Sequence, residues 1–116
     1  YKKFFELYDA LGFSYKTDDK KFIVQGIQGQ IDFIDDIKNC YKQQDEIVEE
    51  LSSLFSNQEK KEYDILSRDD GTYKPTTFEF SSGEAVSVAC HKLDSFIDHL
   101  KLTLYSKEYK DYISRQ

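Results

Sequence analysis

Methionine and tryptophan are absent from the sequence, and only one proline, five glycines and two cysteines occur among its 116 residues. Because Met is missing even at the first position, we expect a trimmed or processed protein, or a piece of a longer chain. No stretch approaches the ~18 consecutive apolar residues of a membrane span, and no cleavable signal pattern is visible. We therefore expect a cytoplasmic protein that does not bind membranes.

Positive charge is also scarce. Acidic residues outnumber Lys and Arg by 22 to 16, which gives a net charge of −6, and Arg is nearly absent. A nucleic-acid-binding protein normally carries a basic face, because phosphate contacts supply most of its affinity. The composition therefore argues against a nucleic acid as partner and fits a basic protein better.

The familiar motifs of catalysis and cofactor binding are missing. The sequence contains no G-x-S-x-G, P-loop, HExxH or CxxC motif. Adjacent carboxylates such as Asp35 and Asp36 fit solvated surfaces, because an acid–base pair needs two environments that separate the two pKa values. Cys90 and His91 are neighbours in a predicted strand, so they would face opposite sides of the sheet. We expect no catalytic site and no cofactor.

The strongest pattern is a broad apolar stripe between about residues 29 and 55. Residues seven positions apart lie nearly above one another on a helix, so interlocked rows merge into one face. The rows are Phe33, Cys40, Ile47 and Leu54; Ile34, Tyr41, Val48 and Phe55; and Ile37, Gln44 and Leu51. A stripe this wide predicts a core helix, with a dimer through Tyr41, Gln44 and Val48 as the alternative. Gln44 interrupts its row, so it should lie where the stripe leaves the sheet, against water, another polar group or a partner.

After Pro75 the apolar period changes to two, which predicts half-buried strands over 76–80, 84–91 and 100–104. Pairing apolar with apolar positions sets the register, because a one-residue slip turns a strand inside out. Gly83 then lies in a three-residue loop, where it is free to take a positive φ. The expected pairs are Phe80 with Val86, Phe78 with Val88, Val86 with Leu104, Val88 with Leu102, and Cys90 with Leu100.

Shorter elements are expected on either side. Residues 2–11 predict a helix that ends at Gly12, residues 13–24 a hairpin, and Gly26 and Gly29 a break before the long helix. Ser56-x-x-Glu59 predicts a second helix over 57–67, and Ser106 an N-cap for a last helix over 107–114. The fold class is α+β: a long central helix packed on a three-stranded antiparallel meander, with shorter N- and C-terminal helices and an N-terminal β-hairpin. Residues 1–116 form one domain.

The two cysteines occupy apolar positions, Cys40 on the predicted helix and Cys90 on the central strand. Buried free thiols are a frequent use of such positions, and we expect them here. A Cys40–Cys90 disulfide is the alternative, and it requires the helix to pack on that strand.

The predicted register places His91 opposite His99, with Cβ atoms about 4.5–5.5 Å apart. Two imidazoles at this distance can share a metal ion, with Asp94 or Asp98 completing the site, or respond to pH as a pair. The simpler interpretation is two exposed histidines beside a loop.

Small side chains follow the polar face of the central strand. Ala85, Ser87 and Ala89, flanked by Thr103 and Tyr105, would let another surface approach closely. Either a helix of the protein itself or a partner is expected to cover them.

These features favour a non-enzymatic protein-binding module. The specific hypothesis is an acidic inhibitor or immunity-type protein that neutralises a basic protein such as a toxin. The alternatives are a small metal-dependent enzyme or metal-binding domain built on His91 and His99, and an interaction or regulatory domain of a larger protein. We expect a monomer or a weak dimer.

Overall fold

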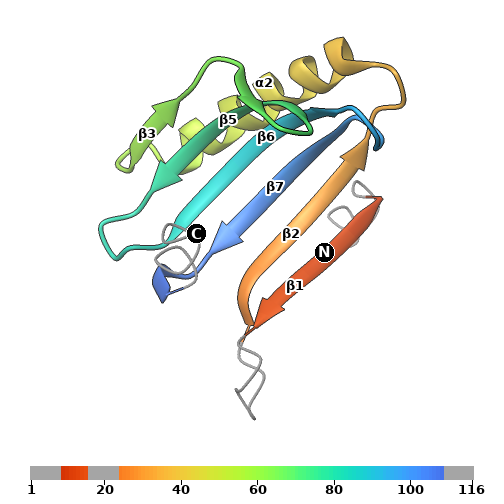
Figure 1. Cartoon of the computed structure of the whole chain (residues 1–116). Coiled ribbons are helices and arrows are strands. Elements are labelled where there is room, and N and C mark those ends of the chain that lie inside the picture. The colour runs from red at the N-terminus through yellow and green to blue at the C-terminus, as the bar shows by residue number, and fades with distance from the viewer. Residues whose placement is uncertain (1–8, 16–23, 109–116) are drawn as a thin grey trace.

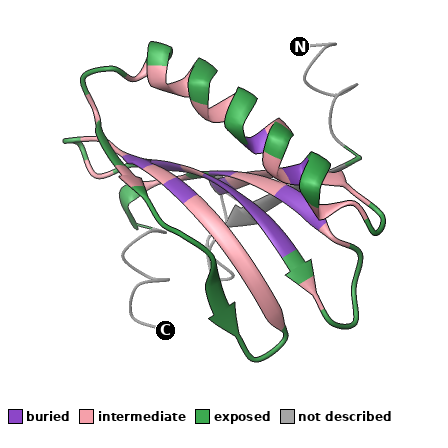
Figure 2. Ribbon diagram, turned by 90° about the horizontal axis from the view of Figure 1, so that it is seen from above, coloured by how far each residue is buried: buried purple, intermediate pink, exposed green. Residues whose placement is uncertain are grey.

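The computed structural model describes residues 9–15 and 24–108. Within them the elements are β1 (Ala10–Tyr15), β2 (Val24–Asp32), α2 (Ile37–Leu54), β3 (Glu59–Glu62), β4 (Leu66–Arg68), β5 (Gly71–Glu79), β6 (Ala85–Leu93) and β7 (His99–Tyr105). The strands form one antiparallel sheet in the order β1-β2-β7-β6-β5-β3, and β4 also pairs with β5. The helix crosses one face of this sheet (Figures 1 and 2).

The predicted fold class is wrong, because the molecule is mainly sheet rather than a long helix on a three-stranded meander. The predicted meander is present as β5, β6 and β7, but β1 and β2 extend it on one side and β3 and β4 on the other. Gly26 and Gly29 lie inside β2 instead of breaking the chain. Glycine weakens a strand pattern by removing side chains from it, so the sequence did not reveal this strand.

The long helix is shorter than predicted and begins at Ile37. Its first expected residues belong to β2, and Ile34, in the connection, is 73% exposed. Tyr41 and Val48 pack on the core and Gln44 is buried, so the alternative dimer surface is used within the chain. No helix in the described residues is long and apolar enough to cross a membrane.

The flanking predictions had mixed outcomes. The helix predicted over 57–67 is wrong, because this segment forms β3 and β4. The N-terminal hairpin is confirmed by the pairing of β1 with β2, and its turn lies outside the described residues. Residues 10–11, predicted to end a helix, begin β1 instead. Most of the helix predicted over 2–11 and most of the helix predicted over 107–114 lie outside the described residues.

The predicted register is confirmed between β6 and β7, where Val86, Val88 and Cys90 face Leu104, Leu102 and Leu100. Between β5 and β6 it is shifted by two residues, so that Phe78 pairs with Val86. A two-residue shift keeps every side chain on its predicted face, which is why the apolar pattern could not distinguish the two pairings. Gly83 takes the predicted positive φ, at 101°.

The core lies between α2 and the central strands (Figure 2). Its buried cluster consists of Cys40, Val88, Cys90 and Leu100, with partly buried apolar residues around it. Cys40 and Cys90 form a disulfide with their Cα atoms 6.0 Å apart, so the predicted free thiols are wrong. The bridge ties the helix directly to β6.

Gln44 is buried against the sheet and bonds only to backbone groups in the described structure. Its side-chain amide nitrogen donates to the carbonyl oxygens of Lys74 at 2.7 Å and Val88 at 3.2 Å, and its oxygen accepts from the Cys90 N–H at 3.2 Å. The expectation that this residue meets another polar group is confirmed, but its expected place, where the stripe leaves the sheet, is wrong, because Gln44 is buried against β5 and β6.

β3 and β4 pair with the same edge of β5 but in registers that differ by one residue. Glu62 is opposite Thr76, whereas Leu66 is opposite Tyr73. Between them, the N–H of Tyr63 donates to the carbonyl of Pro75. In an antiparallel ladder the N–H and C=O of one residue point to the same side, and proline has no N–H, so Pro75 cannot return a hydrogen bond to this neighbouring segment. The ladder is interrupted at this point, and the extra residue acts as a bulge that separates the two strands.

Candidate functional site

A stack of aromatic rings crosses the face of the sheet opposite α2. His91 is directly across from His99, as predicted, with ring centroids 4.9 Å apart and planes within 10°. Tyr73 of β5 stacks on the other side of His91 at 5.9 Å, and Phe96 approaches His99 edge-on at 5.7 Å. Register produces this arrangement, because Tyr73, His91 and His99 occupy one cross-strand row.

The two histidines are buried, not exposed as the simpler interpretation expected. His91 is 9% exposed and His99 is 3% exposed. Burial lowers the pKa of His91 to about 4, helped by the positive charge of His99, Lys101 and Arg68, so the ring is neutral at pH 7. One ring nitrogen of His99, Nδ1, lies 2.9 Å from the carbonyl oxygen of Ile97 and ties the ring to the preceding loop.

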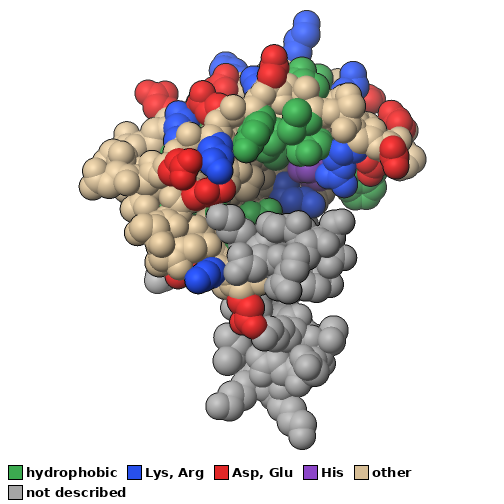
Figure 3. All heavy atoms as spheres, turned by 60° about the vertical axis from the view of Figure 1, so that its left-hand side comes forward, with side chains coloured by type: hydrophobic (Ala, Val, Ile, Leu, Met, Phe, Trp, Pro, Cys, Tyr) green, Lys and Arg blue, Asp and Glu red, His purple; other side chains and the backbone are tan. Residues whose placement is uncertain are grey.

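Two cations lie beside this stack. The guanidinium of Arg68 lies over the Tyr73 ring at 5.3 Å. Lys101 is two residues after His99 on the same face of β7, and burial together with the Arg68 charge lowers its pKa. In Figure 3, Lys or Arg side chains adjoin a histidine beneath a group of apolar side chains. This part of an acidic protein therefore carries locally positive charge.

The two imidazoles of the predicted metal site lie together, but the two predicted carboxylate ligands do not join them. Asp94 and Asp98 lie on the loop between β6 and β7, and both line a pocket beside this loop. No group of three or more His, Cys, Asp or Glu side chains within residues 9–15 and 24–108 is arranged to hold a metal ion. Metal binding by His91 and His99 stays a prediction.

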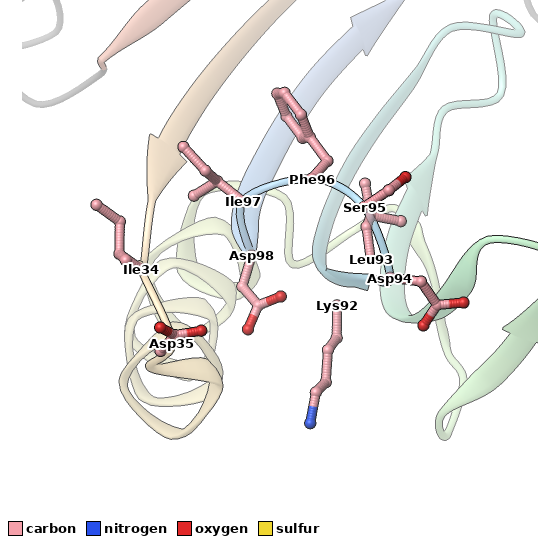
Figure 4. A pocket seen from close by; sticks show the side chains of 9 residues that line it. All are labelled: Ile34, Asp35, Lys92, Leu93, Asp94, Ser95, Phe96, Ile97 and Asp98. Carbon is pink, nitrogen blue, oxygen red and sulfur yellow. The ribbon is translucent and has the colours of Figure 1, made fainter.

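The pocket lies between the loop over 93–98 and the connection that precedes α2. It has a volume of about 540 Å³ and is lined by Ile34, Asp35, Lys92, Leu93, Asp94, Ser95, Phe96, Ile97 and Asp98. Figure 4 shows the carboxylates of Asp35 and Asp98 to one side, that of Asp94 to the other, and Lys92 between them. Three acids against one lysine make the lining negative. Asp35 takes a φ of 51°, a left-handed conformation that Asp tolerates better than most residues.

Large apolar side chains stand exposed around this pocket. Ile34 is 73% exposed, Phe96 58% and Ile97 41%. We call these three residues, together with Asp35, Asp94 and Asp98, the loop patch. Clustered exposed apolar residues with a polar rim are typical of interaction surfaces.

The small-residue row behaves differently from this patch. Ala85, Ser87 and Ala89 share one face of β6 with Thr103 and Tyr105 of β7, as predicted. Ala85, Ala89 and Thr103 are only 2%, 6% and 4% exposed, so they offer little surface to a partner in this conformation. Their role as partner-binding residues stays a prediction.

Comparison with known proteins identifies no relative: no family model, curated protein or solved structure matches the chain. The site therefore has to be interpreted from its own geometry. Sequence reasoning missed Ile34, Phe96, Arg68 and Lys101. Phe96 and Ile97 carried a usable signal, because apolar residues in a predicted loop have no strand face to cover.

Proposed function

We propose that this protein is a non-enzymatic protein-binding module that binds a basic partner through the loop patch. The observation that carries the proposal is an exposed apolar cluster placed directly beside a pocket with three carboxylates. A protein that binds only small molecules has little use for side chains as exposed as Ile34 and Phe96. Protein interfaces commonly combine exposed apolar side chains with charged groups such as these carboxylates.

The chemistry of the pocket specifies what would enter it. A Lys or Arg side chain has a long apolar stem and a charged end. The stem would lie along Ile97 and Leu93, while the charged group would meet Asp35, Asp94 and Asp98. The overall charge of −6 supports the same partner, because it attracts a basic protein over distances of about a Debye length.

An inhibitor or immunity-type protein that neutralises a basic toxin is the specific form of this proposal. The expected cytoplasmic location stays a prediction, and the disulfide between Cys40 and Cys90 favours an oxidising compartment instead. An interaction domain of a larger protein would use the same surface in the same way.

The test is selection of peptides from a random displayed library on the folded, oxidised protein. Bound peptides should combine Lys or Arg with an apolar or aromatic residue, and their binding should weaken as salt is added. Phe96→Ser, and separately Asp94→Asn with Asp98→Asn, should each lower affinity about tenfold or more.

Matched controls remove equivalent groups elsewhere. Ile65→Ser replaces another apolar residue, 51% exposed, and Asp45→Asn with Glu46→Gln removes two exposed charges from α2. Both controls should bind the selected peptides as the wild type does. Selection of peptides without basic residues, or equal loss in controls and loop-patch variants, would exclude the proposal.

A further inference from the structure

Lys101 is a partly buried cation that forms no ion pair within the described residues. The register places it between Ala89 of β6 and Gln30 of β2, and neither neighbour carries a charge. Burial and the Arg68 charge both lower its pKa. A buried charge is normally paired, because removing it from water is costly.

The groups facing Lys101 do not supply the missing negative charge. Arg68 is the second cation, and its exposed pair with Asp70, at 3.7 Å, neutralises it only weakly. On the other side Asp32 is opposite His99 and accepts a hydrogen bond from the side chain of Gln30. The other titratable groups facing this position are Tyr73, His91 and His99.

His91 also has unused hydrogen-bonding capacity. Its ring is held by stacking between Tyr73 and His99, and neither of its nitrogens forms a hydrogen bond within the described residues. Because it is stacked, the ring is fixed in orientation. The neutral ring offers one N–H donor, beside a lysine that forms no ion pair within the described residues and an arginine whose pair with Asp70 is exposed.

We propose that Lys101, Arg68 and His91 bind a tetrahedral oxyanion, a phosphate or sulfate group, on the face of the sheet opposite α2. The oxyanion accepts hydrogen bonds from the lysine ammonium, the guanidinium and an imidazole N–H, and it provides the negative charge that these groups lack. Charge-assisted bonds of this kind are the strong ones. The proposal does not rest on the loop patch, although Phe96 of that patch contacts the His99 ring.

The first test is a titration of the folded, oxidised protein with sodium sulfate, followed by backbone amide NMR shifts at constant ionic strength against sodium chloride. Saturable changes are expected at residues 89–91 and 99–101. Lys101→Met should weaken binding about tenfold or more, while Lys42→Met, which removes an exposed lysine from α2, should not change it. Arg68→Met provides a second loss of binding if Lys101→Met does not fold.

Sulfate shifts no larger than those from chloride, or equal weakening by Lys42→Met, would overturn the proposal. Inorganic phosphate and acetate are the comparison ligands. Phosphate should bind at least as well as sulfate, and tighter binding of acetate would overturn the assignment to a tetrahedral group.

The second test uses pH to detect His91. Sulfate keeps its charge between pH 5 and pH 8, so any change in affinity reports on the protein. Wild-type affinity should rise several-fold as the pH falls, because the bound anion favours protonated imidazole. His91→Phe keeps a stacked ring without the proton and should bind sulfate with a flatter pH profile. Identical profiles in both proteins would remove His91 from the site.

Discussion

The two faces of the sheet are stabilised in different ways. The face under α2 is closed by apolar packing, a disulfide and a glutamine that bonds to the sheet backbone. The opposite face is organised by stacked rings, with two cations beside them and short side chains next to them. Burial and cross-linking resist unfolding, whereas stacked and charged groups are sensitive to protons and ions. Most of the stabilising contacts therefore lie on one face, and the groups that respond to protons and ions lie on the other.

Removing the disulfide, which lies on the helix face, should have the largest effect on the free energy of unfolding. The Cys40–Cys90 bridge closes a sequence separation of 50 residues, and its loss by Cys40→Ala with Cys90→Ala should lower the free energy of unfolding by about 4 kcal/mol. Urea unfolding measures the change, and a reducing agent should destabilise the wild type but not the double variant. A double variant as stable as the wild type would contradict this assignment.

Gln44 provides a smaller test of the same face. Gln44→Leu removes the partners of the Lys74 and Val88 carbonyls and the Cys90 N–H, which should cost about 2 kcal/mol of unfolding free energy. Gln43→Leu is the matched control, because the side chain of Gln43 forms no hydrogen bond within the described residues. Thermal or urea unfolding of the two variants makes the comparison. Equal stability would show that the backbone groups find other partners.

The face opposite α2 should differ from the helix face in how its stability depends on pH. The pKa of His91 is lowered from 6.5 to about 4, so the unfolded chain takes up this proton before the folded one. The histidine's contribution to stability is therefore full above pH 6.5 and is lost as the pH falls towards 4. We expect His91→Phe to gain about 1–2 kcal/mol relative to the wild type between pH 7 and pH 4.5.

The His91 prediction is measured as a difference between two urea-unfolding series. The carboxylates titrate in both proteins, so their contributions largely cancel when the variant is compared with the wild type at each pH. Parallel curves for the two proteins would contradict it, because they would place the imidazole in water.

The sequence predicts those parts of the fold where apolar spacing is regular. Val86, Val88 and Cys90 alternate without interruption, and their pairing with Leu104, Leu102 and Leu100 followed correctly. Gln44 was recognised as an exception because the row around it is apolar, and its bonds to backbone groups explain why a polar residue is tolerated there.

The β3 edge of the sheet could not be predicted, because its strand lacks an apolar signal. β3 has the sequence Glu-Lys-Lys-Glu, and its side chains form ion pairs, including Lys61 with Glu79 at 3.3 Å. Charged edge strands discourage pairing with other chains. The same charged residues leave no apolar alternation from which the strand could be predicted. The candidate site was only partly predictable. The predicted register places the histidine pair and Lys101 on one face, but the position of Arg68 depends on β4, most of which was expected to be helical.

The interruption at Pro75 determines to which side of the sheet the side chains of β4 project. In an unbroken strand, residues 62, 64, 66 and 68 would all project to the side of α2. The one-residue offset reverses this, so Leu66 and Arg68 project with Tyr73 onto the face opposite α2. Deleting a single residue between 62 and 66 would remove the bulge and still leave Leu66 opposite Tyr73, so the guanidinium would stay on its present side of the sheet. A one-residue slip of β4 along β5 at the present chain length would instead move Arg68 to the side of α2 and separate it from the ring on which it lies.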